Sequence, residues 1–313
     1  MTINPKTTAF VFPGQGSQTV GMGRELAAAF PEARQTFEEA DDLLGFSLSK
    51  LMWEGPELDL NDTLNTQPAL FTHSLAAYRV FCARQPGLAP VFMAGHSLGQ
   101  LSAIAASGAL SFADGLRLVR RRGELMKRAG EENPGGMAAI ISLDIPTLDR
   151  VCALASTADE IVQVANDNSP GQVVISGAKP AMERALDLAK AAGARRAIPL
   201  AVSIAAHSPL MTCILPEWEA AVQTANFSDA AIPVIGNVAC APLIRAADLR
   251  ADVLAQMTSR VRWTETVRWL YAQGVTSFIE VGNGAVLTGL VKRIEAEAAT
   301  QSLGNPADFE ALT

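Results

Sequence analysis

The sequence predicts an α/β fold built on a largely parallel sheet, and three observations support this class. Apolar, strand-like runs alternate with helical segments in the N-terminal part of the chain. A serine flanked by glycines follows one such run and precedes a helical segment. From residue 135 onward the order of predicted strands and helices changes, which indicates a second, smaller unit inserted into the first.

The N-terminal elements follow one another at short spacing. The run "TTAFVFPG" (7–14) predicts the first strand, and a helix is expected from about residue 22 to 45. Helices are expected through residues 71–84. Residues 91–94 are apolar and suit a short buried strand, whereas residues 98–110 are rich in Ala and Leu, contain no Pro and predict a helix.

The stretch "GHSLG" (95–99) lies where that strand becomes that helix. In a tight strand-to-helix turn, Gly95 and Gly99 relieve crowding while Ser97 is pushed into a strained and exposed position above the sheet. The helix adds free N–H groups and the positive end of its dipole beside the hydroxyl. The pattern therefore predicts a nucleophile elbow, although the pentapeptide alone is equally compatible with an inert turn.

Residues 135–199 read in the order β-α-β-β-α-β, which is the ferredoxin-like pattern. The turn "NDNSPGQ" (166–172) between its central strands is rich in turn-forming residues. We therefore expect a small ferredoxin-like domain over 131–199, and a large α/β domain formed by 1–130 and 200–313.

Composition narrows the class of function. Of the 313 residues, 49% are apolar and 18% charged, as in a compact soluble enzyme. The net charge of -7 and the 6% aromatic content argue against a nucleic-acid partner, and no apolar run is long enough to predict a membrane span. Three scattered His and four scattered Cys give no metal-ligand spacing, so no metal and no permanently bound cofactor are expected. Unpaired cysteines without a secretory signal favour reduced thiols in the cytoplasm.

Ser97 needs a base, and only three histidines are available. His73 lies in a segment that looks like an amphipathic helix, where a core or capping role is expected. His96 is next to Ser97, and neighbours on a sharp turn point apart. His207, in "VSIAAHSPLM" (202–211), follows an apolar run and precedes Ser-Pro, so it is the expected base.

Six motifs occur in the order found in one enzyme family: "FVFPGQGSQ" (10–18), "GHSLGQ" (95–100), "RRGELM" (121–126), "VANDNSPGQVVISG" (164–177), "AAHSPLM" (205–211) and "EVGNGAVLTGLVKRI" (280–294). On these residues the chain resembles the malonyl-CoA:acyl-carrier-protein transacylases. The resemblance implies a large α/β-hydrolase-like domain with an inserted ferredoxin-like domain and an active site between them. It also implies malonyl-CoA as substrate and acyl carrier protein as partner.

The resemblance implies a ping-pong mechanism through an acyl-Ser97 intermediate, with His207 as base. The imidazole would be oriented by a backbone carbonyl, expected near Arg262, instead of by an acid. The backbone N–H groups of Leu98 and Gln15 would form the oxyanion hole, although "PGQGSQ" (13–18) read by itself is only a Gly/Pro turn.

Arg122 aligns with the family arginine that binds the malonyl carboxylate, for which a planar guanidinium is suited. The neighbouring basic residues of "RLVRRRGELMKR" (117–128) read as a solvated helix face. Gln67 matches a family position near the site, with a helix-capping role as the alternative. The remaining substrate-binding expectations are Met126, His96, Ala206, Asn166 and Arg262.

The chain departs from the family pattern at several positions. Gln100 stands where Glu is most common, so an ion pair there would be lost. Ala206 stands where malonyl-selective relatives often have Ser, and the extra room leaves 2-alkyl malonyl groups open as substrates. Asn283 and Ala285 replace a Pro and a basic residue, which could alter contacts with the carrier.

Alternatives to the transacylase remain at this stage. A stand-alone acyltransferase of a polyketide synthase would share every motif. A serine esterase or thioesterase would share the elbow but should carry a triad acid and no buried arginine, and a non-catalytic carrier-binding scaffold would not need the dyad. Carrier docking requires a basic patch, and two candidates are the helix with Arg117, Arg121 and Lys127 and the small domain's Lys190, Arg195 and Arg196.

Overall fold

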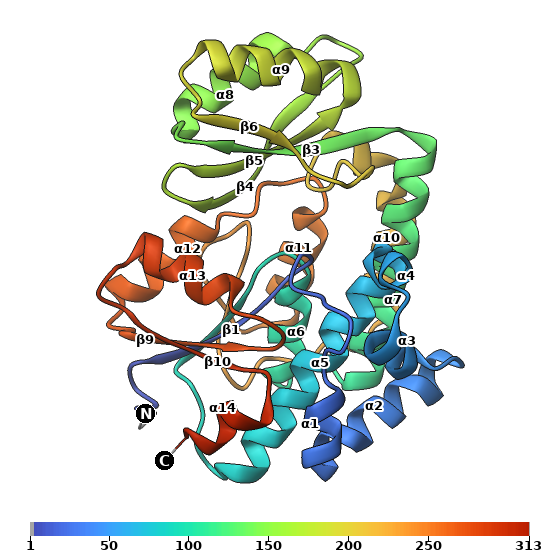
Figure 1. Ribbon diagram of the computed structural model, residues 1–313, viewed down its shortest axis with the longest axis vertical. Coiled ribbons are helices and arrows are strands. Elements are labelled where there is room, and N and C mark those ends of the chain that lie inside the picture. The colour runs from blue at the N-terminus through green and yellow to red at the C-terminus, as the bar shows by residue number, and fades with distance from the viewer. Residues whose placement is uncertain (1–2, 313) are drawn as a thin grey trace.

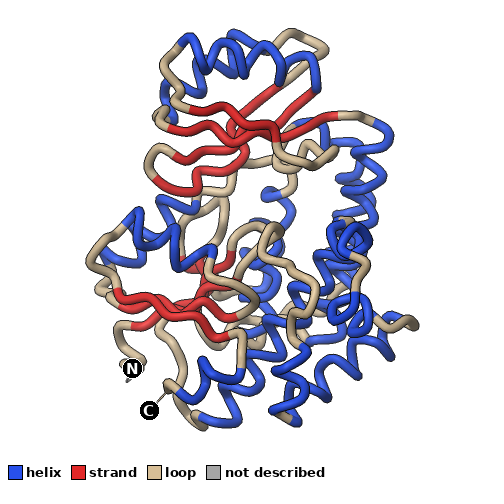
Figure 2. Tube along the Cα trace, in the orientation of Figure 1, coloured by secondary structure: helices blue, strands red, loops and turns tan. Residues whose placement is uncertain are grey.

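The computed structural model describes residues 3–312 and contains two separate sheets (Figures 1 and 2). The larger sheet has the strand order β10-β9-β1-β2-β7-β8, in which β10 to β7 run parallel and β8 is antiparallel to β7. Its strands are β1 (Thr8–Phe12), β2 (Phe92–Gly95), β7 (Val234–Ile235), β8 (Pro242–Leu243), β9 (Ser277–Val281) and β10 (Ala299–Leu303).

Helices cover both faces of this sheet, as the sequence class predicts. The helices of this part of the chain are α1 (Arg24–Ala29), α2 (Pro31–Leu44), α3 (Leu48–Glu54), α4 (Glu57–Asn61), α5 (Thr63–Arg84), α6 (Leu98–Ala106), α7 (Phe112–Glu132), α10 (Leu215–Thr224), α11 (Ala246–Gln256), α12 (Trp263–Ala272), α13 (Val286–Ile294) and α14 (Pro306–Glu310), with the 3-10 turn η1 (Pro209–Ile214).

Alternate residues of β1 pack into two different core clusters, one on each face of the larger sheet. Phe10 and Phe12 pack into the cluster formed with the helices on one face, which include α5 and α7. Ala9 and Val11 point the other way, into the cluster formed with α12 and α13. Because successive strand residues face opposite sides, a central strand covered on both faces must be apolar throughout, and all five residues of β1 are buried.

The smaller sheet is antiparallel and lies above the larger one in Figure 1. Its elements follow the predicted order β-α-β-β-α-β, and the strand order is β4-β5-β3-β6. They are β3 (Gly135–Ile141), α8 (Ile145–Ala155), β4 (Val162–Ser169), β5 (Gln172–Ala178), α9 (Lys179–Ala191) and β6 (Arg196–Pro199). Helices α8 and α9 pack on one face and share a core of their own with the sheet.

Two predicted helices differ from the structure. The single helix expected over 22–45 is two helices, because Phe30 is extended (φ -128°) and Pro31, which has no N–H, begins the second. Helix α5 begins eight residues before the expected position 71 and is not amphipathic, since residues 66–77 are all buried. The elbow helix α6 starts at the predicted residue and ends earlier, at Ala106.

His73 lies in this buried part of α5 and has no hydrogen-bond partner on either ring nitrogen among the described residues. Its ring contacts Phe37. Burial lowers the pKa of His73 to about 4, which the nearby Gly304 backbone only partly opposes. His73 is therefore a neutral core histidine, the first of the two roles that the sequence left open.

This burial makes the fold sensitive to acid. The pKa of His73 is lower in the folded state, so its contribution to stability is complete above pH 6.5 and is lost as the pH falls toward 4. Between pH 7 and pH 5 the share of His73 in the loss of unfolding free energy is about 2 kcal/mol. Urea unfolding of wild type and His73→Leu at both pH values should therefore show a smaller acid loss in the variant. An equal loss would contradict the assignment.

Candidate active site

Ser97 lies at the crossing of β2 and α6 with backbone angles that a serine rarely adopts. Its φ is 52° and its ψ is -109°. The crossing is so tight that a Cβ on Gly95 would stand 2.0 Å from the backbone of Gly99. The strain predicted from "GHSLG" is therefore present, and it holds the serine at the N-terminus of α6.

His207 stands opposite Ser97. Its Nε2 lies 2.7 Å from Ser97 Oγ, and the side chain is buried. Its Nδ1 lies 2.8 Å from the backbone oxygen of Gln256. A carbonyl oxygen only accepts, so Nδ1 carries the proton and the lone pair of Nε2 faces the serine hydroxyl.

The carbonyl that meets His207 was expected near Arg262, and this expectation is wrong. Gln256 is the last residue of α11, six positions before Arg262. The Arg262 guanidinium is partly exposed, donates to the Val238 carbonyl at 2.8 Å and pairs with Glu265. The helix α12 begins directly after Arg262, which turns this side chain toward Glu265 in its first turn and away from the imidazole.

His207 is neutral in this environment. Burial lowers its pKa to about 3, and the charge of Arg122 acts in the same direction. A neutral imidazole is the form that can accept a proton from Ser97. His207 has a left-handed φ of 57°, so both Ser97 and its partner sit in strained backbone positions.

Arg122 is buried in the middle of α7, with 2% of its surface exposed. One nitrogen, Nη2, lies 3.2 Å from Ser97 Oγ and 3.0 Å from Gln256 Oε1, and Nη1 donates to Gln67 Oε1 at 2.9 Å. Burial lowers the pKa of Arg122 to about 10, so the guanidinium is charged at neutral pH. No carboxylate pairs with it among the described residues.

Gln67 and Met126 lie beside this guanidinium. Gln67 Nε2 is 3.3 Å from Met126 Sδ and 3.0 Å from the Thr63 hydroxyl. The alternative of a helix-capping role for Gln67 is wrong, because it lies inside α5 and the cap is Asp62, whose side chain accepts from the Leu64 N–H. Ala206, next to His207, is buried as well.

The loop 13–16 packs against the elbow. A Cβ on Gly14 would stand 2.4 Å from the His96 oxygen, and the His96 N–H donates to the Phe12 oxygen at 3.1 Å. Thr63 donates to the Gln15 side chain at 2.9 Å. The backbone N–H groups of Gln15 and Leu98 have no acceptor within residues 3–312, so both are available to a bound oxygen atom.

His96 faces the smaller sheet. Its Nε2 lies 2.8 Å from Asn168 Oδ1 of β4, its ring contacts Trp263, and burial lowers its pKa. Asn166, the neighbour that the resemblance selected, instead forms a parallel bridge with Val261. No side-chain hydrogen bond joins Asn166 to Ser97, His207 or Arg122 in the part of the chain that the structure describes.

The sequence analysis missed three residues at the site. Gln256 and Gln163 are single amides that neither periodicity nor spacing distinguishes from other polar residues, whereas Asn168 lies in the motif 164–177, from which Asn166 was selected instead. Gln163, on β4 of the smaller sheet, donates from Nε2 to the oxygens of His207 at 2.7 Å and Thr258 at 2.9 Å. It thereby ties the strained base to the smaller sheet.

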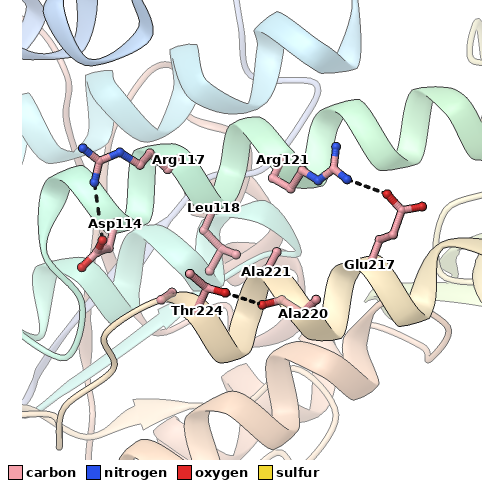
Figure 3. A pocket seen from close by; sticks show the side chains of 9 residues that line it. Asp114, Arg117, Leu118, Arg121, Glu217, Ala220, Ala221 and Thr224 are labelled. Carbon is pink, nitrogen blue, oxygen red and sulfur yellow. Dashed lines mark hydrogen bonds and ion pairs between the residues drawn. The ribbon is translucent and has the colours of Figure 1, made fainter.

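A separate hollow of about 380 Å³ lies between α7 and α10 (Figure 3). Small side chains and two ion pairs line it, Arg117 with Asp114 at 3.6 Å and Arg121 with Glu217 at 2.6 Å. Its lining includes neither Ser97 nor His207. The charges in it are already paired, so this hollow offers no free cation to a ligand.

No helix among residues 3–312 is long and apolar enough to cross a membrane. Within the same residues, no group of three or more His, Cys, Asp or Glu side chains is arranged to hold a metal ion.

The contact of Gln163 predicts a change in serine reactivity. Gln163→Leu removes the donor that holds the His207 carbonyl, and a misplacement of about 1 Å between reacting groups can lower a rate about a hundredfold. We expect labelling of Ser97 by a serine-directed fluorophosphonate to slow at least about tenfold. Gln172→Leu is the matched control, since Gln172 contacts Arg293 between the sheets but touches no site residue. Equal rates in both variants would show that the small sheet does not position the base.

Comparisons with known proteins identify the family of this chain. Residues 9–303 match the family described as acyl transferase domain. The malonyl CoA-acyl carrier protein transacylase of Escherichia coli (strain K12) is 45% identical, with 97% of each chain covered, and that of Bacillus subtilis (strain 168) is 44% identical over 96% of this chain and 95% of its own.

Solved structures of proteins with similar names have the same fold as this chain. An acyl carrier protein S-malonyltransferase from Vibrio cholerae superposes with a TM-score of 0.94 at 43% identity, covering 97% of this chain and 99% of the other. A malonyl-transacylase in complex with a type II polyketide synthase acyl-carrier protein has a TM-score of 0.93 at 45% identity, with 97% of both chains covered. With a serine and histidine at 2.7 Å in a fold shared over its whole length, the chain belongs to the acyl transferase family.

Proposed function

We propose that this protein transfers a malonyl group from malonyl-CoA to the phosphopantetheine thiol of acyl carrier protein. One observation carries the proposal: a buried guanidinium without a carboxylate partner, Arg122, lies 3.2 Å from a serine that is paired with a neutral histidine. A buried cation beside a nucleophile suits an acyl group that has a second, negatively charged end. The names of the relatives at 38–46% identity agree with this activity.

In the first half-reaction Ser97 Oγ attacks the thioester carbonyl of malonyl-CoA, and His207 Nε2 accepts the hydroxyl proton. The tetrahedral intermediate collapses when the C–S bond breaks. The imidazolium returns its proton to the departing CoA thiolate. The product is malonyl-Ser97 with His207 neutral again.

In the second half-reaction the carrier thiol gives its proton to His207 and attacks the malonyl-Ser97 ester. The Ser97 oxygen leaves and takes the proton back from the imidazolium. The bound carbonyl of Gln256 keeps the His207 proton on Nδ1, so Nε2 acts in both directions.

The negative oxygen of each tetrahedral intermediate requires donors that are already in place. The N–H groups of Leu98 and Gln15 support this role, since both lack acceptors among the described residues and loop 13–16 is packed on the elbow. Each such donor is typically worth about 3–4 kcal/mol in the transition state.

An esterase or thioesterase fits less well. The Nδ1 of His207 meets a carbonyl oxygen where a triad would place an acid, and a neutral acyl chain would offer the buried Arg122 no charge to pair with.

The choice between malonyl and 2-substituted malonyl groups depends on the space beside Ala206. A methyl group there is worth only about 1–3 kcal/mol, so a polyketide synthase acyltransferase is the nearest alternative.

We also propose the division into a large α/β-hydrolase-like domain, 1–130 and 200–313, and a small ferredoxin-like domain, 131–199. The two separate sheets and their separate cores support it. His207 and Asn168 lie at the junction, where hydrogen bonds join the sheets.

The thiols of all four cysteines are free, which suits the cytoplasmic location expected from the sequence.

Of the two candidate patches for carrier docking, the one on the small domain has more unpaired charge. Arg117, Arg121 and Lys127 of α7 are each paired with a carboxylate. In the small-domain patch Lys190 pairs with Asp187 at 3.3 Å, whereas Arg195 and Arg196 have exposed side chains and no ion pair within residues 3–312. An acidic carrier would gain more from these unpaired cations.

The nucleophile is tested by mass spectrometry of the intact protein. After incubation with malonyl-CoA the mass should rise by one malonyl group, and Ser97→Ala should abolish the rise because no other described serine has a histidine partner. Retained labelling in the variant would place the acyl group elsewhere. His207→Ala should slow the labelling without moving its site.

The role of Arg122 is tested by substrate choice. Arg122→Ala and Arg122→Lys should both lower malonyl transfer at least about a hundredfold, since a buried hydrogen-bonded charge pair is worth about 3 kcal/mol or more and Lys lacks the planar fork. Acetyl transfer has no carboxylate to pair and should be spared. Rate constants of acylation by malonyl-CoA and acetyl-CoA measure the ratio, and equal losses for both would mean that Arg122 only maintains the fold.

A further inference from the structure

A buried carboxylate stands behind the site and serves none of the reaction steps. Asp252 lies inside α11 with 5% of its surface exposed. Its Oδ1 accepts from the Ala239 N–H at 2.8 Å, and its Oδ2 accepts from the Asn237 N–H at 2.8 Å and from Gln100 Nε2 at 2.6 Å. The Val238 N–H also donates to it, at 3.3 Å from Oδ1. No Lys or Arg pairs with Asp252 among the described residues, so neutral donors alone surround this carboxylate.

An ionised carboxylate can only accept hydrogen bonds, and this fixes the orientation of the amide next to it. Gln100 is fully buried, and its Nε2 must face Asp252. Its Oε1 therefore points the other way, where it accepts from Gln256 Nε2. With the NH₂ group of Gln256 committed to Gln100, the Oε1 of Gln256 faces Arg122 and accepts from Nη2 at 3.0 Å.

The four side chains thus form a chain of hydrogen bonds from the Asp252 carboxylate through Gln100 and Gln256 to the Arg122 guanidinium. Both amides are oriented in the same direction along this line. Each amide has its positive NH₂ end toward the carboxylate and its negative oxygen toward the guanidinium. Reversing Gln100 would place its oxygen against the Asp252 carboxylate and its NH₂ group against that of Gln256. Reversing Gln256 would place its oxygen against that of Gln100 and its NH₂ group against the Arg122 guanidinium. The same Gln256 also supplies the backbone oxygen to His207 and donates to the Ser97 oxygen at 3.0 Å.

Asp252 is also linked to the elbow through Asn237. The carboxylate accepts from the Asn237 N–H. The Asn237 side chain in turn accepts from the Ser97 N–H at 2.8 Å through Oδ1 and donates to the Gly95 oxygen at 2.7 Å through Nδ2. The carboxylate is therefore linked to both sides of the elbow by two short routes.

We propose that Asp252 and Gln100 are positioning residues that fix the direction of this amide line, and thereby hold Arg122 where it selects a carboxylate-bearing acyl group. The inference rests on the proposed function, because it assigns selectivity to Arg122. It explains why Gln stands at position 100 in this chain. The partner there is an acid and not a cation, so a glutamate would face a second buried carboxylate.

Asp252→Asn tests the direction of the line with almost no change in volume. If its oxygen keeps the Ala239 N–H, its NH₂ group takes the place of Oδ2 and faces Gln100, which reverses Gln100 and Gln256 and turns a donor toward the guanidinium. The same exchange removes the acceptor of the Asn237 N–H, which acts on the elbow and not on the amide line. We expect the ratio of malonyl to acetyl acylation rate constants to fall about tenfold or more, as displacements of about 1 Å do in active sites. The matched control is Asp41→Asn, which removes a carboxylate that accepts from the Ser49 N–H and hydroxyl far from the elbow. Its ratio should stay at the wild-type value.

Gln100→Glu provides a second readout should Asp252→Asn not fold. When the introduced carboxyl group is protonated, its O–H donates to Asp252 and its C=O accepts from Gln256, so the direction is kept. Two carboxylates at this distance share a proton with a raised pKa. Once both carboxylates are ionised they repel each other, and this repulsion, not a reversed amide, displaces side chain 100 from Asp252 and loosens the contact with Gln256. The variant should therefore be selective at low pH and lose selectivity as the pH rises, with a titration that wild type lacks over the same range.

The outcomes separate this inference from the proposed function. If Arg122→Ala leaves the malonyl to acetyl ratio unchanged, the proposed function of Arg122 fails. If Arg122→Ala lowers the ratio but Asp252→Asn and Gln100→Glu keep the wild-type ratio at every pH, the positioning role is overturned. A fall of both rate constants by the same factor in Asp252→Asn would also overturn it, because that result describes a structural residue only.

Discussion

The strained turn at Ser97 is the constraint on which the rest of the structure depends. A serine with φ 52° at the end of a parallel strand stays there only if its surroundings hold it. Asn237 bonds to its N–H and to the Gly95 oxygen, Gln256 bonds to its carbonyl, and loop 13–16 packs directly on the elbow. These contacts come from segments far apart in the sequence. Three separate segments are therefore needed to present one hydroxyl.

The smaller sheet helps to hold the base, His207, in place. His207 also has a left-handed φ, and its two ends are held from different sides. The imidazole Nδ1 meets α11 of the large part through Gln256, whereas the His207 carbonyl is held by Gln163 of the small sheet. His96 reaches the same small sheet through Asn168. The strained base is thus held from both parts of the molecule, by Gln256 of α11 and by Gln163 of the small sheet.

The sequence was sufficient for features that depend on local pattern. The elbow, the order β-α-β-β-α-β and the first strand each follow from apolar periodicity and turn residues, and the structure contains all three, with the strand predicted from 7–14 found over 8–12. The split of the helix over 22–45 was also visible in principle, since Pro31 marks it. The carbonyl for His207 was not, because any backbone has one and only the packing of α11 selects Gln256 over the region of Arg262. Likewise, Gln163, Asn168 and Asp252 acquire their roles only from partners distant in sequence.

The electrostatics of the site follow from a charge that has been left without a counter-charge. Arg122 is buried, and its charge together with burial keeps His207 neutral, with a pKa of about 3. A neutral imidazole can accept a proton, but the imidazolium that results would stand near an unpaired guanidinium. Under the proposed function, a malonyl carboxylate on Arg122 would remove that opposition at the moment of proton transfer, whereas a neutral acyl group would leave it in place. The same guanidinium would then favour the dicarboxylic substrate twice, once by pairing with it and once by easing the proton transfer that follows.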